Sequence, residues 1–138
     1  MEPAYDLKPV TSYKAVAAKL FGPGLQKTKI DGKDRVLFEK ASPENKIEWT
    51  MAVGVGDMYS LTISYNNPSQ QLVKGRLQVL ASDGTLMKEE AVELTPTRPG
   101  KSNYISTTTG SMINAGNYKV TLTAKEAEGV MLNALDVQ

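Results

Sequence analysis

The chain has 138 residues, 41% of them hydrophobic, and 16 Lys and Arg against 15 Asp and Glu give a formal net charge of +1. This length fits one domain with one core, and the near balance of charge leaves no excess of cations to neutralise the phosphates of a nucleic acid. The sequence contains neither cysteine nor histidine, which excludes a disulfide framework, a cysteine–histidine zinc site and any catalysis by imidazole.

Residues 1–12 are expected to form a tail or an interdomain linker, and residues 13–138 a single module. The first residues, Met1-Glu-Pro-Ala-Tyr-Asp, lack the basic and apolar regions of a signal peptide, and no apolar run of the chain is long enough to span a bilayer. The three alanines within residues 13–20 favour a helix. That segment is short and directly follows a proline-containing tail, so we interpret it as a first strand.

Apolar and polar residues alternate with a period of two along much of the remaining chain. The clearest runs are residues 47–53, 59–65, 73–79 and 118–124. Such alternation is typical of a strand that has one face on a core and the other face in water.

The aromatic residues in these runs raise the main question about function. Trp49, Tyr59 and Tyr65 share alternating faces with aliphatic residues such as Ile63, and Tyr118 is on the apolar face of its own run. We therefore expect these rings in the interior of the protein, and not on a surface where a ligand stacks.

Clusters of Gly, Asn, Asp and Pro separate the alternating runs, and each can reverse the chain. These clusters are Gly22-Pro-Gly, Asp31-Gly, Gly54-Val-Gly-Asp, Asn66-Asn-Pro, Asp83-Gly, Arg98-Pro-Gly and Asn114-Ala-Gly-Asn. The cluster at residues 54–57 joins two strands, which favours a tight turn over a phosphate-binding loop. Residues 83–84 predict a hairpin. Roughly eight or nine strands, spaced about 8–12 residues apart, predict an all-β fold, an antiparallel sandwich of two sheets or a jelly roll.

No catalytic residue is predicted. Glycoside hydrolysis needs two carboxylates that face each other across a cleft, and the acidic residues of this chain follow no such motif. Most of them fall on the polar face of a strand or beside a turn glycine, where solvation and turn formation account for them.

Residues near loops and strand ends are the better candidates for contact with a ligand. Phe38, Tyr104, Asn66 and Asn67 are in such positions. A sugar would need an exposed ring to stack on and amide groups to bind its hydroxyls, and these residues offer both.

Four stretches of the chain resemble carbohydrate-binding modules of families 6 and 35 and the related malectin-like domains. Glu48-Trp-Thr-Met-Ala-Val and the following Tyr59-Ser-Leu-Thr-Ile-Ser-Tyr-Asn-Asn-Pro are similar to their central strands. Two later stretches are similar to two of their later strands: Ile105-Ser-Thr-Thr-Thr-Gly-Ser-Met-Ile-Asn-Ala-Gly-Asn-Tyr-Lys-Val-Thr-Leu and Gly129-Val-Met-Leu-Asn-Ala-Leu-Asp-Val-Gln. The resemblance covers about residues 13–138 and implies a galactose-binding-domain-like jelly roll.

The resemblance is especially close to the C-terminal module of family-two glycoside hydrolases, the β-galactosidase-like enzymes of gut Bacteroidetes. It implies a noncatalytic accessory module that binds carbohydrate, such as a β-galactoside-like glycan, or packs against the catalytic domain of a parent enzyme. The catalytic carboxylates would lie elsewhere in that parent, which the resemblance places in the periplasm or outside the cell.

The resemblance also implies site residues. Phe38 and Tyr104 match the stacking aromatics of the family. Met131 occupies the place of a sugar-binding asparagine, and Asn133, two residues later on the same strand face, is a substitute for it. Members often hold a structural calcium ion with acidic residues of the first strand, but the segment starting at Tyr13 reads Tyr-Lys-Ala-Val-Ala-Ala-Lys. Calcium needs several oxygen ligands, so no cofactor is expected and a calcium site is disfavoured.

Two alternatives remain at this point. In the first alternative, the module has lost sugar binding and serves as a structural or docking domain. An exposed apolar patch would favour this alternative. Alternatively, it is an adhesion module that binds a protein, because a fold does not determine a function.

Overall fold

The computed structural model describes residues 10–138, and strands make up most of them. The elements in chain order are the strands Thr11–Lys14 (β1), Lys19–Phe21 (β2), Leu25–Ile30 (β3), Lys33–Phe38 (β4), Lys46–Val53 (β5), Ser60–Asn66 (β6), Val73–Ala81 (β7), Leu86–Leu94 (β8), Asn103–Thr108 (β9), Gly116–Thr123 (β10) and Met131–Val137 (β11), with a short 3-10 helix, Ala15–Ala17 (η1), between the first two. No helix among these residues is long and apolar enough to cross a bilayer.

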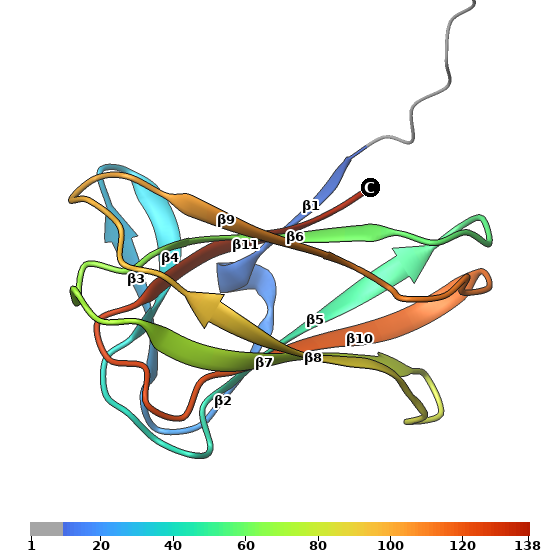
Figure 1. The fold of residues 1–138 in the computed structure, drawn as a ribbon, viewed down its shortest axis with the longest axis horizontal. Coiled ribbons are helices and arrows are strands. Elements are labelled where there is room, and N and C mark those ends of the chain that lie inside the picture. Colours follow the sequence, from blue (N-terminus) through green and yellow to red (C-terminus); the bar gives the residue numbers. More distant parts are fainter. Residues whose placement is uncertain (1–9) are drawn as a thin grey trace, which may run out of the picture.

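The strands form two antiparallel sheets that face each other (Figure 1). Sheet A has the order β3-β4-β11-β6-β9, and sheet B has the order β2-β5-β10-β7-β8. The predicted all-β fold, an antiparallel sandwich of two sheets, is therefore confirmed.

The last strand, β11, has two successive neighbours on one side. On that side it pairs first with β4, through Met131 and Leu132, and then with β1, through residues 134–137, while β6 borders its other side throughout. The pairing with β6 shifts register between Leu132 and Ala134. Asn133 is thus the extra residue of a β-bulge, a feature that changes where a side chain points.

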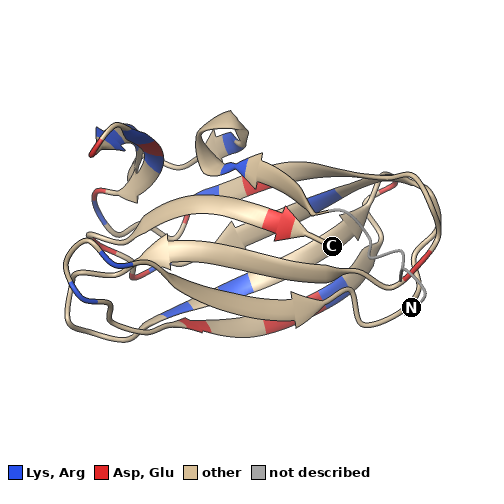
Figure 2. Cartoon of the chain, turned by 90° about the horizontal axis from the view of Figure 1, so that it is seen from above, with Lys and Arg blue, Asp and Glu red and all other residues tan. Residues whose placement is uncertain are grey.

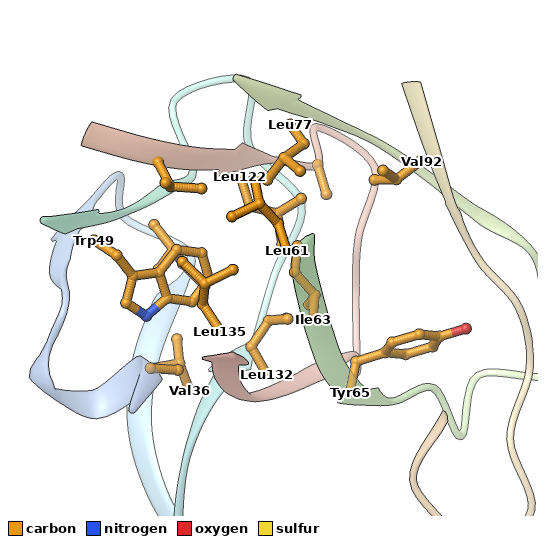
Figure 3. Close-up of a cluster of buried hydrophobic side chains, with 14 of the residues drawn as sticks. Val36, Trp49, Leu61, Ile63, Tyr65, Leu77, Val92, Leu122, Leu132 and Leu135 are labelled. Atoms are coloured by element: carbon orange, nitrogen blue, oxygen red, sulfur yellow. The ribbon is translucent and has the colours of Figure 1, made fainter. Parts of the chain in front are cut away.

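The core lies between the sheets and contains the rings that the alternation assigned to the interior (Figure 3). Trp49 is 2% exposed, and Tyr65 and Tyr118 are also buried. Tyr59 is half-buried against the core, and its hydroxyl donates a hydrogen bond to the carbonyl of Val55. Trp49, Tyr65 and Tyr118 thus fill the interior, as predicted, whereas Tyr59 lies at the edge of the core.

The N-terminal part of the sandwich differs from the single strand predicted for residues 13–20. The chain forms β1 in sheet A, turns through η1 and enters sheet B as β2. Ala15 is fully buried at this crossing, where a small side chain lets the chain pass from one layer to the other. Of the expected tail, residues 1–9 lie outside the described residues, and Thr11 and Ser12 already belong to β1.

Residues 54–57 and 83–84 both connect consecutive strands, as predicted. Residues 54–57 belong to the connection between β5 and β6. The hairpin between β7 and β8 turns at Asp83 and Gly84, where Gly84 has a φ of +90°. Hydrogen bonds from the side chain and backbone of Thr85 lower the pKa of Asp83, so its carboxylate stabilises the turn.

Candidate functional site

A cluster of polar side chains lies on the outer face of sheet A, where four strands meet. Arg35 comes from β4, Asn133 from β11 and Asn66 from the end of β6. Ser102 directly precedes β9, and Tyr104 is the second residue of that strand. We call these five residues the polar cluster. Strand order brings them close together, because β4, β11, β6 and β9 are consecutive neighbours in the sheet.

Hydrogen bonds hold the polar cluster in place. Nη1 of Arg35 donates to Oδ1 of Asn133 at 2.7 Å and to Oδ1 of Asn66. Nδ2 of Asn133 donates to Oγ of Ser102 at 3.2 Å. Asn66 is buried, and its Nδ2 donates to the carbonyl of Lys101. Because Arg35, Asn66, Ser102 and Asn133 are hydrogen-bonded to one another, these four side chains are pre-organised beside Tyr104.

The local sequence explains why Arg35 and Asn133 point outward. In β4, Val36 and Phe38 are buried, so the alternating position 35 faces away from the core. In β11, Leu132 and Leu135 are both buried although they are three residues apart, and the bulge at Asn133 makes this spacing fit.

The polar cluster borders an open groove of about 420 Å³. The groove is lined by Ser12, Lys14, Gly32, Lys33, Asp34, Arg35, Ser102, Tyr104, Asn133 and Ala134. Its walls therefore carry three cationic side chains and one carboxylate. Nε of Arg35 is buried and has no hydrogen-bond partner among the described residues, and most of the groove's polar groups are donors.

Three of the five residues nominated by the sequence belong to this site. Tyr104 is 62% exposed and lines the groove, and Asn133 and Asn66 are joined by Arg35. Whether these residues bind a ligand stays a prediction.

The other two nominated residues do not belong to it. Phe38 is fully buried in the core, because it shares the inward face of β4 with Val36. Asn67 is also fully buried, and its side chain donates to the carbonyls of Leu94 and Gln71 at 2.8 and 2.7 Å. A ligand can reach neither side chain, so both expectations were wrong.

Sequence reasoning missed Arg35 and Ser102. The alternation of Arg35 with buried Val36 and Phe38 is a local signal that would have marked Arg35 as outward-facing. Nothing local to Ser102 indicates that it lies beside Asn133, 31 residues later in the chain.

Other parts of the described chain are less suited to a sugar. The ring of Phe21 is partly exposed, but the ammonium groups of Lys46 and Lys19 lie 4.4 and 5.1 Å from its centre, and these cation–π contacts occupy it. Residues 10–138 contain no group of three or more acidic residues that could hold a metal ion.

The chain is similar to known proteins in its three-dimensional structure. No family model matches the chain, and no curated protein does. A family 35 carbohydrate-binding module from Clostridium thermocellum superposes with a TM-score of 0.77 at 19% identity, over 94% of this chain and 98% of that one. The C-terminal CBM6 module of LamC, a laminarinase from Zobellia galactanivorans, gives 0.66 at 15% identity, over 94% and 99%.

The fold is that of these carbohydrate-binding modules. The predicted jelly roll is thereby confirmed, and the structurally similar modules that this chain covers almost completely are binding modules and not catalytic domains. The same fold also occurs within a larger enzyme, an exo-β-1,3-galactanase from Phanerochaete chrysosporium solved with β-1,3-galactotriose. The TM-score is 0.74 at 13% identity, and the match covers 98% of this chain and 30% of the galactanase.

Proposed function

We propose that the chain is a noncatalytic carbohydrate-binding accessory module, which holds a glycan in the groove beside the polar cluster. The observation that carries the proposal is the exposed ring of Tyr104 next to the fixed side chains of Arg35 and Asn133. An exposed aromatic ring flanked by a few well-placed polar groups is the usual composition of a small-molecule site.

The chemistry of the groove fits a sugar. One face of a pyranose ring is apolar and packs on an aromatic ring, while its hydroxyls need donors and acceptors around them. The guanidinium of Arg35 and the hydroxyls of Ser102 and Tyr104 can donate, and the oxygens of Asn133 and Asp34 can accept. None of these groups must move far, because the polar cluster is already hydrogen-bonded.

The proposal extends to a β-galactoside-like glycan as ligand and to a glycoside hydrolase as the parent protein, a β-galactosidase-like enzyme of family two that works in the periplasm or outside the cell. The resemblance of residues 48–53, 59–68 and 129–138 supports it. The exo-β-1,3-galactanase, which contains this fold as one part of its chain, gives further support.

We expect Tyr104→Ala to weaken glycan binding by at least about tenfold, because the apolar ring contact is lost. The measurement is calorimetry on galactose, β-1,3-galactotriose, glucose and cellotriose. Tyr104→Phe keeps the ring and removes only the hydroxyl, so this variant should retain most of the affinity for the glycan. Met112→Ala is the matched control, because Met112 is 73% exposed and lies in the β9–β10 loop, away from the groove. Equal affinities for the wild type and Tyr104→Ala would contradict the proposal.

A second candidate function, docking to a neighbouring domain, is favoured by an apolar region at the other end of the sandwich. Val55 and Met112 are 72% and 73% exposed, and their two loops are tied together by the pairing of Asp57 with Ile113. These loops lie at the right of Figure 1, away from the groove. If docking is the function, Val55→Lys should release the module from the catalytic domain of its parent and leave glycan binding unchanged.

A further inference from the structure

The strands at the ends of the two sheets differ in charge. The strand order of sheet A ends in β3 and β9, and that of sheet B ends in β2 and β8. Three of these strands carry charged side chains, which are Lys19 on β2, Lys27 and Lys29 on β3, and Lys88, Glu89, Glu90 and Glu93 on β8. The fourth strand, β9, carries none, and no part of it is blue or red in Figure 2. Charged side chains commonly prevent an edge strand from pairing with another chain, and β9 lacks them.

The backbone of β9 presents hydrogen-bonding groups at its free edge. Thr109, the residue after β9, donates its N–H to the carbonyl of Tyr59, the residue before β6, at 2.8 Å. Successive residues of an antiparallel strand direct their backbone groups alternately to one neighbour and to the opposite side. The backbone groups of Tyr104, Ser106 and Thr108 therefore point away from β6, where no other described strand pairs with β9. All three residues are exposed.

This pattern of outward backbone groups is symmetric about Ser106. If two β9 strands pair antiparallel with Ser106 opposite Ser106, these two residues exchange N–H···O bonds, and the N–H of each Thr108 meets the carbonyl of Tyr104 in the other strand. The N–H of Tyr104 is not needed for this pairing, because it already donates to Oδ1 of Asn103 at 2.9 Å. The free edge of β9 is thus complementary to the same edge of a second copy, as a two-fold contact requires.

The side chains of β9 also fit this pairing. On the outer face, Tyr104 lies opposite Thr108 of the second copy, and an aromatic side chain pairs favourably with a β-branched one across strands. No like charges of the two β9 strands meet, because the strand has none. On the inner side, Glu90 of β8 accepts a hydrogen bond from Thr107 and lies 3.8 Å from Nζ of Lys88, so its charge is compensated within one copy.

We propose that β9 is a dimerisation edge, to which a second copy of this chain adds its own β9 in antiparallel orientation around a two-fold axis at Ser106. The two copies then share one continuous sheet in the order β3-β4-β11-β6-β9-β9-β6-β11-β4-β3. Such a contact closes on itself and produces dimers and not filaments. Because the axis is perpendicular to the sheet, the grooves of both copies open on the same face. The inference involves no ligand, so its test is separate from that of the proposed function.

Cysteine cross-linking tests the register of the pairing, because the chain has no cysteine of its own. In Ser106→Cys the two new thiols lie opposite each other at a Cα separation of about 5.5 Å, which a disulfide can span. Mild oxidation should therefore convert most of this variant into a covalent dimer on a non-reducing gel. Thr108→Cys is the matched control and should stay monomeric, because its two cysteines are more than about 12 Å apart along the strands. Equal cross-linking of both variants, or of neither, would overturn the inference.

Charge variants test the same edge by sedimentation. The contact of one strand is small and its dimer weak, so the wild type is followed up to about 1 mM, where it should be largely dimeric. Ser106→Lys and Ser106→Asp each place like charges opposite each other, which is destabilising, so either variant alone should be monomeric. Their mixture should dimerise again, because opposite charges then meet at the axis, and this recovery shows that both variants are folded.

Thr50→Lys is the control for the charge itself, because it places the same side chain at an exposed position of sheet B. This variant should associate like the wild type. A wild type that is monomeric throughout the series contradicts the proposal, and so does a mixture of the two Ser106 variants that does not reassociate. Association that persists in Ser106→Lys alone would place the contact elsewhere on the molecule and would also refute the role of β9.

Discussion

Replacing Phe38 by alanine is expected to lower the free energy of unfolding by roughly 3–5 kcal/mol, the usual cost of removing a fully buried aromatic ring. Phe38 is completely inaccessible and belongs to the same core as Trp49 and Leu132. The truncation would lose the free energy gained by burying the ring away from water. It would also leave a cavity, because a close-packed interior relaxes only in part. Denaturation by urea, followed by the fluorescence of Trp49, would measure the change.

A comparison of Phe38→Ala with Tyr104→Ala also tests which of the two aromatic residues stabilises the core and which one binds the glycan. Both aromatics were candidates for stacking on a sugar, but Tyr104 is 62% exposed. Tyr104→Ala should change the unfolding free energy by less than about 0.5 kcal/mol, as is common for surface substitutions. The assignment fails if Phe38→Ala keeps wild-type stability and loses glycan binding.

Asn67→Ala should destabilise the protein by about 2–4 kcal/mol, because several hydrogen bonds are lost in a buried site and each orphaned polar group costs about 1–3 kcal/mol. The side chain of Asn67 bonds the carbonyls of Leu94 and Gln71 and accepts a hydrogen bond from the backbone of Ser69 at 3.1 Å. It thus fastens the connection that follows β6 to the end of β8. Chemical denaturation is again the measurement.

Asn114→Ala is the matched control for Asn67, because Asn114 is an exposed asparagine of a turn cluster. We expect a change within about 0.5 kcal/mol for this variant. Equal stability of the two variants would mean that the buried amide does not hold the loop. Selective loss of glycan binding in Asn67→Ala, without a loss of stability, would restore the role in recognition that the sequence had suggested.

The neighbouring asparagines 66 and 67 show where sequence reasoning reaches its limit. Both were nominated because they lie near the end of a predicted strand. Asn66 ends β6 in contact with Arg35 at the outer face, whereas Asn67 turns inward toward Leu94. The alternating pattern cannot tell which of the two asparagines points inward, because the pattern ends with the strand and the loop that follows has a different backbone conformation.

By itself, the sequence determined the class of fold, the interior position of Trp49, Tyr65 and Tyr118, and the exclusion of histidine and cysteine chemistry. These properties depend on composition and on a period of two residues, which are local and can be read from neighbouring positions. Tertiary structure alone decided which polar side chains meet. Arg35 contacts residues 31 and 98 positions away, and those contacts follow from the order of strands in sheet A and from one bulge. No local pattern contains that order, because it results from packing the whole chain into two layers.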